Sequence, residues 1–292
     1  MTMKNIIEYI PFLLLIKIAQ LLGFQKLSTA SKFISFLLYN VLKIRRDIVI
    51  KNLSIAFPDW DREKIDDISK KCYLHFSKFL LEMMNIPKLK IEGIKNLIEC
   101  DENDLKNLRA EYEKGSGLIF LTAHLGNWEL GAISVPAQMG TIMHPIVKPQ
   151  RNQYVTHWLN NMRETHGNKV IPLGISIREI FEVIRSGELL GVVGDQRGPK
   201  EGKRVKLFER DTAIFSGTAE IVAKTNAPLY CLFAVRVKDH YKAFVERIDL
   251  NEMPSNKEEK IDAINQRFAE LLEKYVRLYP EQWFWMHNIW KY

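Results

Sequence analysis

The chain has 292 residues, of which 47% are hydrophobic and 26% are charged. That length and composition can bury a large packed core, and they favour one elaborated α/β domain with a small appendage over two equal domains. The net charge of +7 and a pI near 9.1 favour an anionic partner, such as nucleic acid, anionic lipid or an acidic carrier protein. Charge alone does not separate these partners from each other, or from a soluble protein that is merely basic.

The three cysteines, Cys72, Cys100 and Cys231, are scattered along the chain. Their odd number argues against a disulfide framework, and no CxxC motif or Cys/His cluster indicates zinc. We therefore expect buried, reduced thiols, no bound metal and a cytoplasmic redox setting.

The N-terminal segment 6–24 is strongly apolar and lacks the small-residue cleavage site of a signal peptide. Glu8, Pro11 and Lys17 interrupt it, whereas a membrane span needs about 20 mostly apolar residues. We expect a helix that lies in a membrane interface or is partly inserted into it.

A second apolar segment, 33–42, runs directly into Lys43, Arg45 and Arg46. Basic residues beside apolar helices suit the anionic cytoplasmic leaflet of a membrane. Residues 1–46 are therefore predicted to form membrane-associated helices, and residues 47–292 the main domain. A buried helical hairpin in a soluble fold is the alternative interpretation.

The next part of the chain is predicted to be mainly helical. One helix ends near Pro58, residues 59–63 resemble the cap of the next, and apolar residues recur at helical spacing over 65–84. Residues 91–113 are charged and predict a strand followed by a helix.

From Gly117 onward, strands and helices alternate. The predicted strands are 118–123, 141–147, 170–172, 189–193, 229–235 and 242–248. The predicted helices lie near 128–138, 154–166, 175–186, 218–225 and 257–279. This alternation predicts an α/β fold with a mixed, mostly parallel sheet flanked by helices. Neither a GxGxxG fingerprint nor a P-loop occurs.

His124 follows the first of these apolar strands, and Glu129 comes five residues later at a predicted helix start. A strand-end histidine held by a carboxylate can act as a general base. Sites in open α/β sheets gather at the carboxyl ends of strands, and a helix start after Gly126 offers N–H groups to an anion. The His-x4-Glu spacing also arises by chance. The prediction that His124 is a general base therefore depends on its position at the end of a strand, beside Gly126 and Asn127.

Polar residues also follow a second apolar strand. Asp195, Gln196 and Arg197 come after strand 189–193, so they should lie at the same edge of the sheet as His124. The carboxylate could orient a cation or receive a hydroxyl proton. Asp-x-x-Gly is equally common in ordinary turns.

Basic residues gather in the same half of the chain. Lys148 and Arg151 follow strand 141–147, and Arg163 lies on the next predicted helix, where its guanidinium suits phosphate or carboxylate. A basic loop comes after Asp195, with Lys200, Lys203, Arg204 and Lys206. The tail 279–291 contains three tryptophans, which can line an apolar groove, lie at a membrane interface or pack in the core.

Together these motifs resemble the bacterial lipid A biosynthesis acyltransferases, the lauroyl/myristoyl transferase family. The matching elements are Asn52-Leu-x-x-Ala-Phe-Pro58, Thr122-Ala-His-Leu-Gly-Asn-Trp-Glu129, Lys148-Pro-x-x-Asn152, Arg163, Gly194-Asp-Gln196 and Pro280-Glu-Gln-Trp-x-Trp-x-His287. The wider glycerolipid acyltransferase group shares a His-x4-Asp version but not the Trp-rich ending. Lys148 stands where the family usually has arginine, and Arg197 where it usually has an acidic or aromatic residue.

The resemblance implies catalytic roles for His124 as general base, for Glu129 as its partner, and for Arg163 and Asp195. Arg163 or backbone N–H groups near Gly126 would stabilise the oxyanion. Substrate contacts are expected from polar residues in or beside the matching motifs, which are Asn127, Lys148, Arg151, Asn152, Gln196 and Arg197.

The implied activity is O-acyl transfer from an acyl carrier protein thioester to a hydroxyl of a lipid A precursor, on the cytoplasmic face of the bacterial inner membrane. No cofactor is expected beyond the donor itself, which is acyl carrier protein or coenzyme A thioester. The expected partners are the carrier protein, a lipid acceptor and a membrane surface, not nucleic acid. The basic loop 200–206 suits either the acidic carrier or lipid phosphates. An acyltransferase on a glycerophospholipid or another lipid, and a non-catalytic lipid-binding relative, stay open as alternatives.

Overall fold

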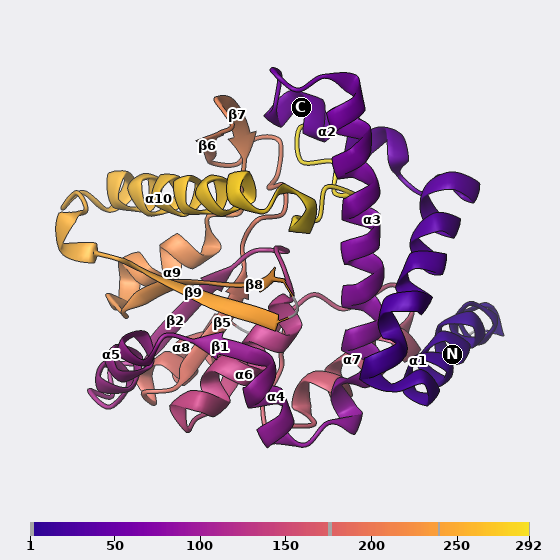
Figure 1. Ribbon diagram of the computed structural model, residues 1–292. Helices are drawn as coiled ribbons and strands as arrows, with labels where there is room; N and C mark the ends of the chain where they lie inside the picture. Colours follow the sequence, from indigo (N-terminus) through magenta and orange to yellow (C-terminus); the bar gives the residue numbers. More distant parts are fainter. Residues whose placement is uncertain (1–2, 175–176, 239, 292) are drawn as a thin grey trace.

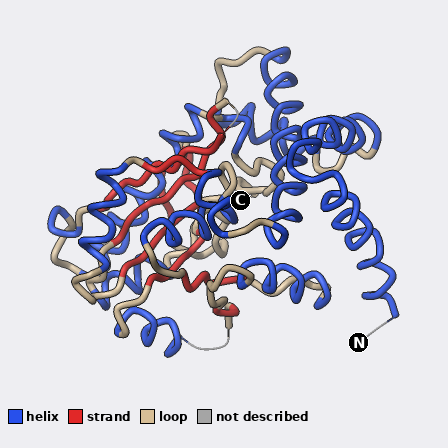
Figure 2. The backbone as a smooth tube through the Cα atoms, turned by 60° about the horizontal axis from the view of Figure 1, so that its bottom comes forward, coloured by secondary structure: helices blue, strands red, loops and turns tan. Residues whose placement is uncertain are grey.

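The computed structural model describes residues 3–174, 177–238 and 240–291. A seven-stranded sheet with strand order β1-β9-β8-β2-β5-β3-β4 lies at its centre, and helices cover both faces (Figures 1 and 2). Its strands are β1 Ile98–Cys100, β2 Leu118–Thr122, β3 Met143–Val147, β4 Ile171–Pro172, β5 Leu189–Val193, β8 Leu229–Val237 and β9 His240–Ile248. All neighbours pair in parallel except the antiparallel β8–β9 hairpin, so the predicted mixed, mostly parallel sheet is confirmed.

The α-helices follow the predicted alternation closely from residue 117 onward. Their bounds are α1 Met3–Phe36, α2 Arg46–Ala56, α3 Arg62–Asn85, α4 Ile91–Leu97, α5 Glu102–Tyr112, α6 Trp128–Met139, α7 Gln153–Glu164, α8 Ile177–Arg185, α9 Gly217–Thr225 and α10 Lys257–Leu278. The predicted helix 175–186 is confirmed from Ile177, because residues 175 and 176 lie outside the described residues.

The central strand β2 shows how the layers are built. Leu118 and Phe120 pack with α4, α5 and α6, whereas Ile119 and Leu121 pack with α9 and α10 on the opposite face. Successive side chains of a strand point to opposite faces, so a strand covered on both sides must be apolar at every position. The continuous apolar run that predicted this strand therefore reflects two helical layers.

The N-terminal helix α1 stands beside the sheet and packs against α3 (Figures 1 and 2). Gly23, with φ 64° and ψ 170°, interrupts its helical geometry. Met3–Phe24 is long and apolar enough to cross a membrane, and only 11% of its most apolar stretch is buried. The exposed large apolar side chains of α1 are Met3, Ile6, Ile7, Ile10, Leu13, Leu14, Ile18, Leu21, Phe33 and Phe36. This outward-facing apolar surface is consistent with membrane association, while the division at residue 46 stays a prediction.

Two regions differ from the expected elements. Residues 91–113 begin with helix α4, because Ile94 is buried against α6, and the strand is the short β1. The basic loop 200–206 partly forms strand β6 Arg204–Leu207, which pairs with β7 Arg210–Ala213 in a two-stranded hairpin. Alternation of charged and apolar residues over only four positions gave too weak a signal to predict that hairpin.

Candidate active site

His124 and Asp195 form a hydrogen-bonded pair at the carboxyl edge of the sheet. Strands β2 and β5 are adjacent and parallel, with Thr122 opposite Val193, so the residues two positions further along also come together. The distance between His124 Nδ1 and Asp195 Oδ1 is 2.7 Å, and the His124 backbone N–H donates to Asp195 Oδ2 at 2.9 Å. One carboxylate therefore orients both the imidazole and the backbone that carries it.

The indole of Trp283 is the other partner of this carboxylate. Its Nε1–H donates to Asp195 Oδ2 over 2.8 Å, at a buried position. Burial alone would raise the pKa of Asp195, but His124 and the hydrogen bonds from His124 and Trp283 outweigh burial and hold that pKa below its usual value. Asp195 is thus an anion at neutral pH.

The anionic Asp195 sets the protonation of His124. Burial lowers the pKa of the imidazole, but the charge and hydrogen bond of Asp195, together with the charge of Glu129, raise it above its ordinary value against the opposing charge of Arg163. When Nδ1–H donates to Asp195, the lone pair of the neutral ring lies on Nε2. His124 therefore has the tautomer that a general base needs.

Glu129 binds Arg163 and not the imidazole. Arg163 Nε donates to Glu129 Oε2 at 2.9 Å, and Nη2 donates to Oε1 at 2.6 Å, which makes a two-pronged ion pair. The predicted pairing of the His124 ring with Glu129 is therefore wrong, and Asp195 takes that place. Glu129 still acts on His124 through its charge, and the catalytic roles of Glu129 and Arg163 stay predictions.

The turn 125–127 brings the chain from β2 into α6. Gly126 has φ 66°, and a Cβ at this position would lie 2.0 Å from the carbonyl oxygen of Ala234. Its N–H donates to the carbonyl of Gln282 at 3.1 Å, and the N–H of Asn127 donates to the carbonyl of Ala234 at 2.8 Å. Because both N–H groups are already bonded within the protein, the expectation that they stabilise an oxyanion is wrong at these two positions. Arg163, the other predicted oxyanion donor, donates to Glu129, and its role at an oxyanion stays a prediction.

Two narrow cavities adjoin at His124 and share residues 283–285 as lining. The first also contacts polar side chains, which are Asn52, Asp195, Gln196 and His287. The second is mostly apolar, and its further lining residues are Val49, Cys72, His75, Phe76, Phe79, Trp128, Gln282 and Met286. The candidate base therefore borders one cavity lined by both polar and aromatic side chains and a second that is mostly apolar. Trp283 and Trp285 of the tail pack in the core and line both cavities, whereas Trp290 packs against the core.

Arg151 and Asn152 connect α7 to the N-terminal helix. Arg151 Nη2 forms an ion pair with Glu8 Oε1 at 2.7 Å. Asn152 Nδ2 donates to the carbonyl of Asn5 at 2.8 Å, while its Oδ1 caps α7 by accepting the N–H of Tyr154. Neither residue lines the two cavities, so these expected substrate ligands serve in this structure to hold α1.

Asn127 and Gln196 have different positions relative to the cavities. Asn127 is completely buried, and its Oδ1 caps α6 by accepting the N–H of Leu130 at 3.0 Å. It is therefore closed off from a substrate, contrary to its expected role. Gln196 lines the cavity beside His124, which is compatible with substrate contact.

Arg197 contacts the C-terminal tail. Its backbone N–H donates to His287 Nε2 at 3.0 Å, and its guanidinium donates to the carbonyl of Asn288. Lys148, in contrast, is exposed in the loop after β3. The two positions that depart from the family pattern thus lie in different surroundings.

The basic loop carries less free charge than its sequence suggests. Lys203 forms ion pairs with Glu258 at 2.9 Å and Asp262 at 3.0 Å. Lys206 pairs with Asp211 across the hairpin at 3.0 Å. Two of its four cations are therefore matched by carboxylates.

Trp283, His75 and His287 are functional candidates that the sequence analysis did not assign to the site. Trp283 and His287 belong to a motif that was recognised, but their contacts with Asp195 and Arg197 depend on where the tail lies. His75 lies on the helix α3, outside the motifs that the sequence showed. Its Nε2 is 3.1 Å from the carbonyl oxygen of Gly126.

The described residues contain no group of three or more His, Cys, Asp or Glu side chains that could hold a metal ion. The cysteines are free thiols, of which Cys72 and Cys231 are buried as expected and Cys100 is partly exposed.

The fold and the site define an α/β enzyme with a candidate histidine base bordering two narrow cavities, and with an exposed apolar helix at its N-terminus. Residues 3–292 match the family model of the bacterial lipid A biosynthesis acyltransferases, so the chain belongs to this family and is an acyltransferase. It is also similar to the lipid A biosynthesis lauroyltransferase of Escherichia coli (strain K12), with 21% identity over 257 residues that cover 86% of this chain and 80% of that protein. Family membership supports acyl transfer in lipid A biosynthesis, with a lipid as acceptor.

Proposed function

We propose that this protein transfers a fatty acyl chain from an acyl carrier protein thioester to a hydroxyl of a lipid A precursor, at the cytoplasmic face of the inner membrane. The observation that carries this proposal is the imidazole of His124, held by Asp195 through Nδ1, where a cavity lined by polar and aromatic side chains meets a mostly apolar one. The attack of a lipid hydroxyl on an acyl thioester is accelerated by a positioned base that takes up the hydroxyl proton.

The proposed reaction is a direct transfer without a covalent enzyme intermediate. His124 Nε2 takes the proton of the acceptor hydroxyl, and the oxygen attacks the thioester carbonyl. The tetrahedral intermediate then expels the carrier thiolate, which receives the proton from the imidazolium. General base action of this kind contributes about 10²–10⁴-fold to the rate.

The His124–Asp195 hydrogen bond and the Glu129–Arg163 ion pair have separate parts in this mechanism. Asp195 stabilises the imidazolium that forms during proton transfer, since it already accepts a hydrogen bond from the ring. Arg163 is the proposed oxyanion donor, a role worth roughly 3–4 kcal/mol per donor. Glu129 holds that guanidinium in place with two hydrogen bonds.

The exposed apolar face of α1 supports a membrane location. Large apolar side chains such as Ile7, Leu14 and Leu21 point outward from a helix long enough to cross a bilayer. An exposed apolar surface of this length is costly in water, and a membrane would cover it. Whether the helix crosses or lies on the membrane is decided by accessibility labelling of single cysteines placed at its two ends.

The net charge of +7 supports an acidic carrier protein as the donor's vehicle. Since Lys203 and Lys206 already have carboxylate partners, a docking role in the basic loop falls to Lys200 and Arg204, which have no carboxylate partner among the described residues. Charge reversal at Lys200 should weaken use of the acyl carrier protein but not of acyl coenzyme A. Equal loss with both donors would instead indicate contact with lipid phosphates.

The decisive experiment is incubation of the purified full chain in detergent with acyl carrier protein thioesters of several chain lengths. Candidate acceptors are a lipid A precursor and a lysophospholipid, and mass spectrometry identifies the lipid that gains an acyl mass. We expect gain on the lipid A precursor, and none with the His124→Ala variant. Gain on the lysophospholipid alone would move the proposal to a glycerolipid acceptor, and no gain on any lipid would favour a non-catalytic relative.

A further inference from the structure

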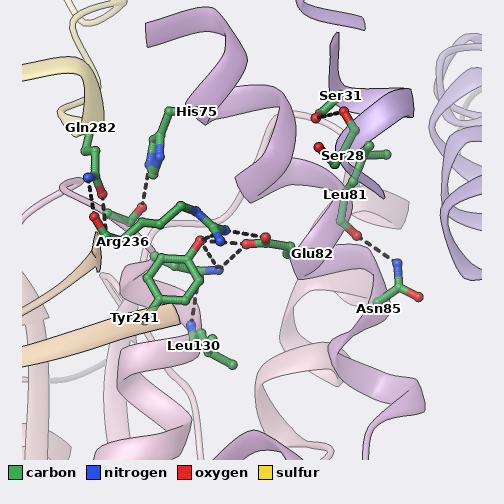
Figure 3. Close-up of polar contacts among 12 residues, drawn as sticks. Ser28, Ser31, His75, Leu81, Glu82, Asn85, Leu130, Arg236, Tyr241 and Gln282 are labelled. Atoms are coloured by element: carbon green, nitrogen blue, oxygen red, sulfur yellow. Dashed lines mark hydrogen bonds and ion pairs between the residues drawn. The ribbon is translucent and has the colours of Figure 1, made fainter. Parts of the chain in front are cut away.

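A buried cluster of charged and polar side chains lies next to the turn 125–127. It consists of Glu82 from α3, Arg236 from β8 and Tyr241 from β9 (Figure 3). The hydroxyl of Tyr241 donates to Glu82 Oε2 at 2.6 Å, and Arg236 Nη2 contacts both Glu82 Oε1 and the tyrosine hydroxyl. Glu82 and Tyr241 are buried, with 6% and 2% of their surface exposed.

The Glu82–Arg236–Tyr241 cluster is bonded directly to the turn that follows His124. Asn127 Nδ2 donates to Glu82 Oε2 at 3.3 Å, while the other side of the Asn127 amide caps α6. The side chain that starts α6 is therefore oriented by a carboxylate from a different part of the fold.

A second connection runs through the C-terminal tail. The side-chain amide of Gln282 accepts the N–H of Arg236 and donates to its carbonyl, each at 2.8 Å (Figure 3). The carbonyl of Gln282 accepts the N–H of Gly126 at 3.1 Å. The residues that follow Gln282 then meet the catalytic pair, since Trp283 donates to Asp195 and the N–H of Phe284 donates to the carbonyl of His124 at 2.9 Å.

His75 adds a neutral hydrogen-bond donor to the same turn. Burial, aided by the charges of Arg236 and Lys78, lowers the pKa of His75 to about 4 although its bond to Gly126 opposes this. The ring is therefore uncharged at neutral pH, and Nε2–H donates to the carbonyl of Gly126 at 3.1 Å. The N–H and the carbonyl of Gly126 are thus both bonded to distant parts of the chain.

From these contacts we propose that Glu82, Arg236 and Tyr241 are positioning residues for acyl transfer. They fix two segments, the turn that follows His124 and the part of the tail that precedes Trp283, the indole partner of Asp195. By fixing both segments they keep His124 and Asp195 within hydrogen-bonding distance. The expected effect on the rate of acyl transfer rests on the proposed function. The positioning of His124 against Asp195 does not depend on it. Buried ion pairs hold their place only when every partner is present, so the loss of one member should release the turn. A displacement of about 1 Å in a catalytic group can cost about 10²-fold in rate.

The chain offers a matched control for each variant. Tyr275 donates its hydroxyl to Glu246 Oε1 at 2.7 Å, and Lys274 pairs with the same carboxylate. Among the described residues, these side chains form no hydrogen bond or ion pair with the turn 125–127 or with the tail from Gln282 to His287. Tyr241→Phe is therefore compared with Tyr275→Phe, and Glu82→Gln with Glu246→Gln. The double variant Glu82→Gln/Arg236→Met removes both charges and serves if Glu82→Gln alone does not fold.

The first readout is kinetic and requires an active wild-type protein. We expect kcat to fall about 10-fold in Tyr241→Phe and about 10²-fold in Glu82→Gln, on the scale of a misplaced catalytic group, with the KM values for donor and acceptor within about 2-fold of wild type. The control variants Tyr275→Phe and Glu246→Gln should keep wild-type kcat.

The second readout does not depend on activity. The pKa of His124 is measured by NMR of histidine labelled in its ring, with the His124→Gln variant to assign its signal. The charged groups that set this pKa are Asp195, Glu129 and Arg163. If the cluster holds His124 against Asp195, the pKa should fall in Tyr241→Phe and Glu82→Gln and stay unchanged in the control variants.

The outcomes separate the two proposals. An inactive wild type whose His124 pKa falls in the cluster variants would remove the proposed function and retain the positioning role. Cluster variants that melt earlier yet keep the wild-type His124 pKa, and wild-type kcat where that can be measured, would show that the cluster only stabilises the fold and would overturn this inference.

Discussion

Two carboxylates lie near His124, and they have different kinds of partner. Asp195 comes from the strand β5 and is bonded to a side chain that titrates near neutral pH, whereas Glu129 comes from the helix α6 and is bonded to a guanidinium that stays charged. The Asp195 pair can therefore take part in proton transfer, while the Glu129 pair provides a fixed electrostatic environment. The chain spacing of five residues between His124 and Glu129 does not decide which carboxylate binds the ring, because the neighbouring strand supplies a better placed one.

The largest effect is expected from Asp195→Asn. The amide has nearly the shape of the carboxylate but can hold His124 in the wrong tautomer, and the analogous change in the Ser-His-Asp triad lowers kcat about 10⁴-fold. We expect a loss of similar size in kcat for acyl transfer, measured by mass spectrometry of the acceptor lipid with a folded variant.

The corresponding substitution on the other carboxylate sharpens this comparison. If Glu129→Gln lowers kcat more than Asp195→Asn does, the ring partner in the working enzyme is Glu129 and not Asp195. The Asp195→Asn protein should also show a lower His124 pKa, since the charge of Asp195 raises it.

A smaller loss is expected from Glu129→Gln itself. Glu129 and Arg163 side chains are 8% and 17% exposed, so removing one charge leaves the other buried and unpaired. That should lower the free energy of unfolding by about 3–5 kcal/mol. It should also lower kcat about 10²-fold through misplacement of the guanidinium.

A double variant separates the two consequences. Glu129→Gln/Arg163→Met should regain stability, measured by denaturant unfolding, without regaining kcat. Recovery of both would mean that this ion pair serves the fold and not the reaction.

The sequence predicted the fold well where tertiary packing leaves a local mark. Strands covered on both faces must be apolar throughout, and β5 was predicted with its observed bounds, 189–193, for that reason. The helix α4 and the hairpin of β6 and β7 were missed because short segments of alternating charge leave no clear period.

The sequence predicted both members of the His124–Asp195 pair but not the contact between them. His124 and Asp195 were both found because each follows an apolar strand. Their pairing depends on β2 lying next to β5, an order in the sheet that no local pattern encodes. The same reason explains Trp283, whose bond to Asp195 joins positions 88 residues apart.

The pH dependence of the reaction tests whether Asp195 raises the pKa of His124. Below that pKa, kcat/KM should change by about 10-fold per pH unit. A general base must be deprotonated, and the pKa of His124 is raised above its ordinary value near 6.5. The acid limb of kcat/KM should therefore lie above pH 6.5, and activity should fall as pH decreases through it. In Asp195→Asn the limb should move to lower pH. A wild-type limb below pH 6.5 would contradict the raised pKa.

The smallest effect is expected at Arg151, which sequence analysis placed among the substrate ligands and which the structure pairs with Glu8. This ion pair is largely exposed, with the Arg151 side chain 80% in solvent, so such a contact contributes about 0–1 kcal/mol. Arg151→Gln should leave kcat and the acceptor KM within about 2-fold of wild type, because the removal of an exposed charge pair of this strength shifts equilibria only slightly. Glu8→Gln is the matched control, because it breaks the same ion pair and leaves the guanidinium in place. If Arg151→Gln raises the acceptor KM tenfold while Glu8→Gln does not, Arg151 binds the acceptor lipid after all, and the contact with α1 must open when that lipid enters.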